Sequence, residues 1–185
     1  MKKATSYYNE LIDFYIEKPE GWSFFPTQWA RTQKTKTAAS NSNLSAIMAQ
    51  SKTPLLYMQR NIGRDNLAQP TVQASCRYFA QPSRETRANL AALQIQVFEE
   101  NYANFKLLSH CANSTLSNCP ALFFHVQFSL KHSSGEAYEC LSQSWTVFSN
   151  DISYTIGLSG SPENINEYES DLSDIISSVA IGKSS

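Results

Sequence analysis

The 185-residue chain has little glycine, and the motifs that use glycine for chemistry are missing. Its 6 glycines form no glycine-rich phosphate-binding loop. The hydrolase patterns Gly-x-Ser-x-Gly and His-Glu-x-x-His are absent as well. No apolar stretch approaches the roughly 20 residues that a membrane-spanning helix requires. The sequence therefore gives no support for a phosphate-binding loop, for either hydrolase class or for a membrane span.

Charge is also scarce. The 15 basic and 16 acidic residues leave a net charge of −1, and charged residues make up only 17% of the chain. Such a chain has no overall field that would attract nucleic acid or an anionic membrane. Serine, threonine, asparagine and glutamine supply most of the polarity, which we interpret as favouring a periplasmic or otherwise exported protein.

The N-terminus leaves the compartment open. Met1-Lys2-Lys3 resembles the charged start of a secretory signal, but no apolar segment follows it. Either the protein is cytoplasmic or a natural leader has been removed. Residues 1–5 are expected to be a tail, and 6–182 a single domain, because 42% hydrophobic residues supply one full core.

Alternating apolar residues predict most of the secondary structure. They indicate strands over 12–17, 54–60, 71–78, 122–131, 138–149 and 152–158, with a short strand at 105–108. Ser83 and Ser161 are typical helix caps, and each precedes an apolar stripe with helical spacing. One helix should run to Tyr102, and the other should end at Gly182. The predicted fold is α+β, an antiparallel sheet of about six to seven strands packed with two main amphipathic helices.

The order of these elements resembles the PsbP/Mog1/DcrB superfamily. The resemblance is carried by Pro19-Glu20-Gly21-Trp22, Gln69-Pro70-Thr71-Val72, Asn118-Cys119-Pro120-Ala121 and Ser161-Pro162 at the starts of successive elements. It implies an α/β/α sandwich of a kind used by an extrinsic photosystem subunit, a Ran-binding nuclear factor, a periplasmic lipoprotein and effector chaperones. It implies no catalytic residues and no cofactor.

Cysteine chemistry is the main alternative to a plain binding domain. Cys111 and Cys119 flank a polar, turn-forming segment and are candidates for a disulfide, whereas Cys76 is expected to be a small buried residue. His110 and His125 lie nearby, but a C-x₇-C spacing does not suit zinc. We expect no metal and no catalytic residue, although a thiol or histidine hydrolase using His110, Cys111 or His125 stays open.

Polar residues alternate with apolar ones along three successive strands. Together they could form one polar face several strands wide, made of His125, Gln127, Ser129, Ser142, Ser144, Thr146, Ser153 and Thr155. Such a face is either a solvated outer surface or a partner surface, such as a shallow groove lined with neutral hydrogen-bonding groups.

Three hypotheses follow for function. The first is a non-catalytic protein-binding or assembly module, expected in the bacterial cell envelope. The second is a cytosolic chaperone for apolar protein segments, and the third is the small thiol- or histidine-dependent hydrolase. We expect a protein partner, no nucleic acid, and a monomer or weak dimer.

Overall fold

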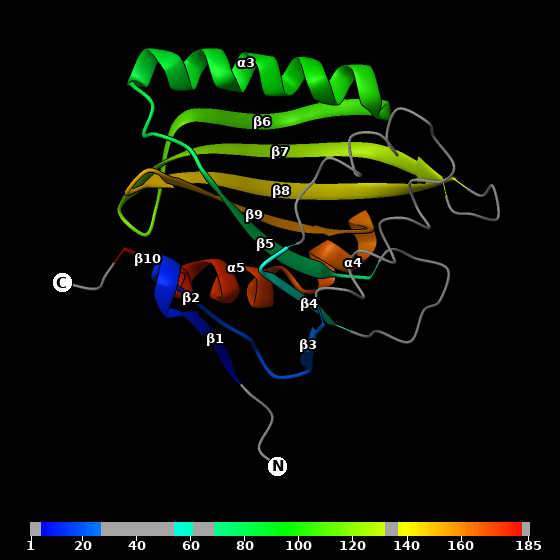
Figure 1. The fold of residues 1–185 in the computed structure, drawn as a ribbon. Coiled ribbons are helices and arrows are strands. Elements are labelled where there is room, and N and C mark those ends of the chain that lie inside the picture. The colour runs from blue at the N-terminus through cyan, green and yellow to red at the C-terminus, as the bar shows by residue number, and fades with distance from the viewer. Residues whose placement is uncertain (1–4, 27–53, 61–68, 132–136, 183–185) are drawn as a thin grey trace.

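The computed structural model describes residues 5–26, 54–60, 69–131 and 137–182. They form two antiparallel sheets with helices on both sides (Figure 1), which confirms the predicted α+β class. The three-stranded sheet has the order β1 (Ser6–Asn9), β2 (Phe14–Glu17), β10 (Ala180–Ile181). The seven-stranded sheet has the order β3 (Trp22–Phe25), β4 (Leu56–Arg60), β5 (Thr71–Tyr78), β9 (Ile152–Gly160), β8 (Ala137–Ser149), β7 (Cys119–Lys131), β6 (Ala103–Leu116).

The helices begin where the capping residues predict. Ser83 Oγ accepts a hydrogen bond from the Thr86 amide at the start of α3 (Arg84–Asn101), and Ser161 caps α4 (Pro162–Glu167). The single C-terminal helix predicted from periodicity is wrong. Tyr168, with φ −115° and ψ 25°, separates α4 from α5 (Glu169–Ser178), and Gly182 follows β10 rather than a helix. A short 3₁₀ helix, η1 (Glu10–Ile12), joins β1 to β2.

Two tight turns set the register of the long strands. Asn150 and Asp151, between β8 and β9, have φ values of 49° and 58°, as the two central residues of a type I′ turn require. Ser117 and Asn118, with φ values of 53° and 61°, make the equivalent turn between β6 and β7. The segment before Ser117 is therefore part of strand β6, and the prediction of a turn-forming segment between Cys111 and Cys119 is wrong there.

The two faces of the large sheet carry separate hydrophobic cores. One core contains Tyr154, Ile156 and Leu158 of β9 together with Phe14 of β2 and Ile175 of α5. The other lies under α3 and is built mainly from β7 residues, namely Leu122, Phe124, Val126 and Phe128. Since successive strand residues point to opposite faces, each long strand contributes to both cores or to one core and one open surface.

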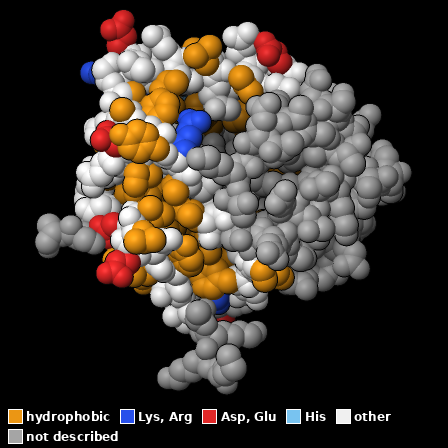
Figure 2. All heavy atoms as spheres, in the orientation of Figure 1, with side chains coloured by type: hydrophobic (Ala, Val, Ile, Leu, Met, Phe, Trp, Pro, Cys, Tyr) orange, Lys and Arg blue, Asp and Glu red, His pale blue; other side chains and the backbone are white. Residues whose placement is uncertain are grey.

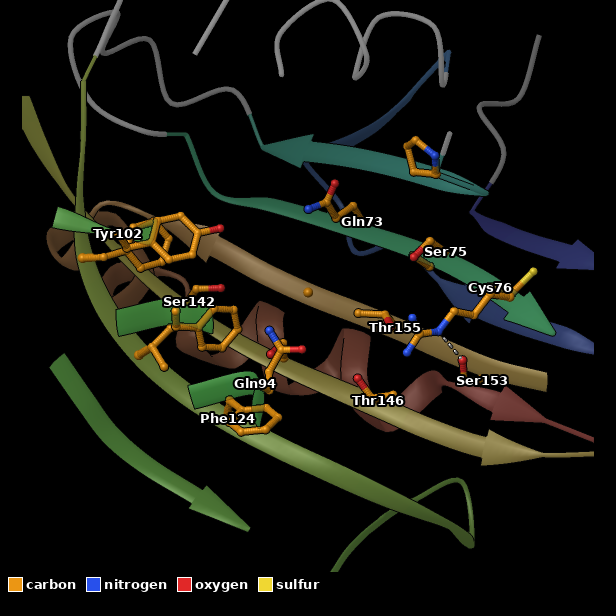
Figure 3. Close-up of a pocket in the computed structure, with 18 residues that line it drawn as sticks. Gln73, Ser75, Cys76, Gln94, Tyr102, Phe124, Ser142, Thr146, Ser153 and Thr155 are labelled. Atoms are coloured by element: carbon orange, nitrogen blue, oxygen red, sulfur yellow. Dashed lines mark hydrogen bonds between the residues drawn. The ribbon is translucent and has the colours of Figure 1, made fainter. Parts of the chain in front are cut away.

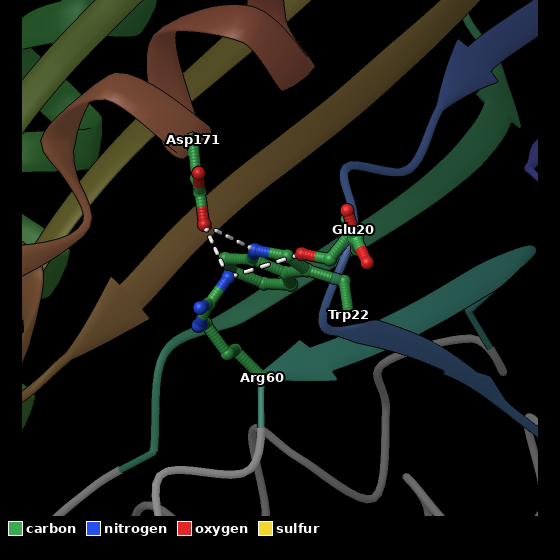
Figure 4. A network of polar contacts seen from close by, with 4 residues as sticks. All are labelled: Glu20, Trp22, Arg60 and Asp171. Atoms are coloured by element: carbon green, nitrogen blue, oxygen red, sulfur yellow. Dashed lines mark hydrogen bonds and ion pairs between the residues drawn. The ribbon is translucent and has the colours of Figure 1, made fainter.

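A polar cluster ties the first of these faces to α5. Asp171 accepts hydrogen bonds from Trp22 Nε1 at 2.9 Å and from Arg60 Nη1 at 2.7 Å (Figure 4). Arg60 also donates to the Glu20 carbonyl and stacks over the ring of Tyr168, with 4.3 Å between its guanidinium carbon and the ring centroid. The turn before β3, the end of β4 and the start of α5 are held together by this one carboxylate.

The apolar stripe of α3 is wider than the surface it covers. Leu93 and Val97 are 58% and 41% exposed, whereas Ala91 is buried against the β7 side chains. Tyr78, at the end of β5, is 80% exposed. None of the helices in the described part of the chain is both long and apolar enough to cross a bilayer. The sequence of residues 30–53 predicts a polar loop closed by a short helix, and these residues lie outside the described part of the chain.

Candidate functional site

A groove of about 560 Å³ lies on the α3 face of the large sheet. Strands β5, β9, β8 and β7 and the C-terminal half of α3 all contribute to it. Figure 3 shows the side chains around it, with Tyr102 at one end and Ser153 at the other. Its described lining contains neither aspartate nor glutamate. A volume of this size is in the range of small-molecule and short-peptide sites.

The floor of the groove is made of neutral hydrogen-bonding side chains. Strand pairing places them in rows across β5, β9 and β8: Ser75, Thr155 and Thr146 in one row, and Gln73, Gly157 and Ser144 in the next. Gln94 of α3 also lines the groove. Hydroxyls and amides both donate and accept hydrogen bonds, so this floor can pair with either polarity of a ligand group.

The wall beside α3 is aromatic. Tyr102 packs on Phe128 with 4.2 Å between ring centroids, and Phe98 meets Phe124 edge to face at 5.9 Å. Burial raises the pKa of Tyr102, so its hydroxyl stays protonated at neutral pH and can donate a hydrogen bond. A ligand in the groove would therefore contact an apolar surface on one side and hydroxyls on the other.

Arg77 is the only basic residue of the described lining. Its Nε donates to Ser153 Oγ at 3.2 Å, and its guanidinium carbon lies 5.2 Å from the Phe79 ring centroid. Ser153 is only 1% exposed, so the hydroxyl that positions Arg77 is itself fixed by burial. In the part of the chain that the structure describes, no carboxylate pairs with Arg77.

The single polar face predicted from the sequence is divided between the two sides of the sheet. Ser142, Ser144, Thr146, Ser153 and Thr155 line the groove. His125, Gln127 and Ser129 point to the opposite face, because the β7–β8 register places His125 beside Gln143 and Phe124 beside Ser144. Alternation correctly divides the residues of each strand between two faces. Which face of one strand lies beside which face of the next depends on the register between them.

The three misplaced residues have different surroundings. Gln127 and Ser129 both donate to the carboxylate of Glu139, at 3.0 and 2.6 Å. The bond from Ser129 lowers the Glu139 pKa most, and the bond from Gln127 lowers it further. His125 Nε2 is buried without a hydrogen-bond partner among the described residues, and burial lowers the pKa of this imidazole. His125 is therefore neutral at neutral pH.

The predicted disulfide is not formed. All four cysteines are free, and Cys111 pairs with Phe123, four positions along β7 from Cys119. That offset is about 13 Å along a strand, whereas the Cα atoms of a disulfide lie within about 7 Å. Burial raises the pKa of Cys140 to about 12, so this thiol is not ionised at neutral pH.

The residues considered for thiol or metal chemistry do not gather into a site. Cys111 and His125 share a face, but no hydrogen bond joins them, and His110 points to the other side with Phe124. Among the described residues, no group of three or more His, Cys, Asp or Glu side chains could hold a metal. This arrangement supplies neither an activated nucleophile nor an orienting third group.

Several groove residues were not singled out from the sequence. Gln73, Ser75 and Arg77 alternate with the buried residues of β5, so the pattern assigns them to one face, but it does not say that β5 lies beside β9. Gln94 lies in α3 and Tyr102 is the residue that follows it; the sequence predicts this helix to be amphipathic but does not indicate that it borders a groove. Strand order, which local patterns do not encode, brings these residues together.

Comparison with solved structures identifies the fold. Cyanobacterial PsbP (CyanoP) from Synechocystis sp. PCC 6803 superposes with a TM-score of 0.55 at 9% identity, covering 95% of this chain and 91% of that chain. The chain has the PsbP/Mog1/DcrB-like fold. The resemblance seen in the sequence is confirmed at the level of the fold.

Other solved structures that resemble this chain differ widely in description. LpqN, involved in cell envelope biogenesis of Mycobacterium tuberculosis, gives a TM-score of 0.52 at 13% identity, covering 91% of this chain and 83% of that chain. PA94 from Pseudomonas aeruginosa, a protein of unknown function, also gives 0.52, at 12% identity, covering 66% of this chain and 80% of that chain. No family model and no curated protein matches the sequence. At these identities the likeness concerns the fold alone.

Proposed function

We propose that the chain is a non-catalytic protein-binding module, with residues 6–182 forming one domain and the groove beside α3 as its binding site. The observation that carries this proposal is the groove itself, about 560 Å³ with a neutral polar floor and an aromatic wall. Its floor offers hydroxyl and amide groups of the kind that pair with a peptide backbone, and its wall suits apolar side chains.

The chemistry of the groove favours this function over the two alternatives. A chaperone for apolar segments would present a mainly apolar groove, whereas here Ser144, Thr146 and Thr155 occupy the floor. A hydrolase needs a nucleophile next to a base, and Cys111 and His125 have no hydrogen bond between them. Reversible binding of a partner, with no chemical step, requires only the groove.

We place the protein in the bacterial envelope. This proposal rests on the low content of charged residues, 17%, and on the description of LpqN as involved in cell envelope biogenesis. A disulfide would have supported export, but all four cysteines are free. Figure 2 shows hydrophobic side chains gathered on one face of the molecule, with acidic side chains around its margin, a distribution compatible with contact to another protein.

A peptide selection tests the proposal. Phage-displayed random peptides would be selected on the intact protein, and the enriched peptides then measured on Gly157→Val, which fills the middle of the groove floor, and on Ser173→Val, an exposed position of α5. We expect binding to the native protein and to Ser173→Val, with at least a tenfold loss in Gly157→Val. Failure to enrich any peptide, or equal binding to both variants, would contradict the proposal.

A further inference from the structure

We propose that the groove recognises the free C-terminal carboxylate of an extended peptide and that Arg77 is the residue that binds it. The inference deepens the proposed function, on which it rests, by naming the chemical group that the site selects. Four observations support it: the unpaired charge of Arg77, the way Arg77 is held, the polar floor, and the open space above Gly157.

Arg77 has a positive charge that the described groove does not neutralise. It is the single cation of the described lining, which contains no acid. The only ion pair formed within the described residues joins Arg60 to Asp171 on the opposite face of the sheet. A guanidinium offers its donors in a planar fork that matches a carboxylate, so the natural complement of this groove is a ligand with one carboxylate.

Two contacts fix the position of the Arg77 guanidinium. Ser153 Oγ accepts the hydrogen of Arg77 Nε, and the guanidinium carbon lies over the Phe79 ring, 5.2 Å from its centroid. Both terminal nitrogens are left without a partner in the described part of the chain. An arginine already ordered in this way loses less conformational entropy when it binds.

The floor distinguishes a peptide from a fatty acid, which also has a carboxylate. An acyl chain lying on Gln73, Ser144 and Thr155 would cover their polar groups without supplying hydrogen bonds, and each buried unpaired group is unfavourable. An extended peptide supplies an amide and a carbonyl at every residue. Ser142 to Thr146 on β8 spans roughly 13 Å, the length of about four extended residues.

Gly157 leaves room for the peptide at the centre of the floor. A Cβ atom built there would meet only the Gln73 Cγ, at 3.9 Å, so neither packing nor a left-handed backbone requires glycine. A glycine that a strand does not need sterically is typical of a place where another backbone approaches closely. It lies two rows from Arg77, in line with Ser144 and Phe124.

Two fluorescently labelled hexapeptide pools of identical composition would test the inference, one ending in a free carboxylate and the other in a carboxamide. Their affinity would be measured by anisotropy on the intact protein, Arg77→Gln, Arg77→Lys, Lys106→Gln and Gly157→Val. Lys106 is an exposed residue of the edge strand β6 outside the groove, and its replacement removes the same charge. Dodecanoate would be the competing acid probe.

We expect the acid pool to bind native protein and Lys106→Gln at least tenfold more tightly than the amide pool. Arg77→Gln should abolish that preference without changing the amide pool, and Arg77→Lys should keep part of it. Equal binding of both pools, with loss of both in Gly157→Val, would overturn the role of Arg77 and leave the proposed function standing. Binding of neither pool to native protein would overturn both. Tighter binding of dodecanoate than of any peptide would overturn the assignment to a peptide.

Discussion

The two faces of the seven-stranded sheet are built from the same strands but differ in what covers them. On β9, Tyr154, Ile156 and Leu158 are buried against β2 and α5, while Thr155 and Gly157 face the groove. On the α3 side the buried residues come mainly from β7, with Cys140 and Phe148 of β8, and they pack with Ala91 of α3. One side of β9 therefore contributes mainly to folding free energy, and the other is available for binding.

The comparison also shows where charge is used. On the packed face, Asp171 neutralises Arg60 and accepts the indole hydrogen of Trp22. On the groove face, Arg77 has a hydroxyl partner but no described counter-charge. A paired charge fixes elements of the fold to one another, whereas an unpaired one is free to attract a ligand.

The largest effect is expected on the packed face. Phe14 is fully buried and stacks on Tyr154, with 6.0 Å between ring centroids, so Phe14→Ala should lower the free energy of unfolding by about 3–5 kcal/mol. Urea denaturation followed by tryptophan fluorescence measures the loss. Tyr8→Ala, on the neighbouring strand and 54% exposed, should change it by less than about 1 kcal/mol. Equal losses would remove the distinction between the buried and exposed sides of this small sheet.

Removing the shared carboxylate should have an intermediate effect. Asp171→Ala removes the acceptor of the buried Trp22 indole and one of the two acceptors of the Arg60 guanidinium, and we expect a loss of about 1–3 kcal/mol in unfolding free energy. Asp174→Ala removes an exposed acid from the same helix and should cost under about 0.5 kcal/mol. The same urea titration serves for both variants, and a similar loss in each would mean that the cluster does not stabilise the fold.

Acidification should weaken the protein through His125. Burial lowers the pKa of this imidazole from 6.5, so the unfolded state takes up its proton first. The associated stability is complete above pH 6.5 and declines as the pH falls from there toward the folded-state pKa. Unfolding free energy measured at pH 7.5 and 5.5 should therefore fall more in native protein than in His125→Gln.

The matched variant for this pH effect is His110→Gln, at an exposed position of β6. It should keep the pH dependence of the native protein. An unchanged dependence in His125→Gln would instead show that other groups are responsible.

The smallest effect is expected on the outer side of α3. Leu93 is 58% exposed, so Leu93→Gln should change the unfolding free energy by less than about 0.5 kcal/mol. Ala91→Leu, two residues earlier but buried, should cost about 1–3 kcal/mol by overpacking against β7. A large loss in Leu93→Gln would indicate that this side of α3 is covered in solution.

Period-two alternation was enough to predict β5, β7, β8 and β9, most clearly on the apolar side of β7 from Leu122 to Phe128. It did not predict the length of β6, Ala103–Leu116, of which only 105–108 was expected to be strand. The Ser83 and Ser161 caps were equally predictable, since a side-chain oxygen before an apolar stripe satisfies free helix amides. The fold class follows from these local signals and from the order of the elements.

The groove could be predicted only in part. The hydroxyls of β8 and β9 were recognised, but a shift of one residue in register moves a whole strand to the other face, as it does for His125. The register is set by two-residue turns such as Ser117-Asn118. Both residues have positive φ angles but neither is a glycine, so the sequence lacks the usual signal for this turn. For the same reason, two cysteines eight residues apart lie on paired strands and not around one loop.

The most direct test of the account is a scan of β9 in which unfolding free energy and affinity for the acid peptide pool are measured on the same variants. Ile156→Ala and Leu158→Ala should each lower the free energy of unfolding by about 2–5 kcal/mol. Thr155→Val and Gly157→Val should change it by less than about 1 kcal/mol while weakening peptide binding at least tenfold. If stability and binding losses fall on the same positions, or do not follow the alternation of the strand, the division of this sheet into a packed face and a binding face is wrong.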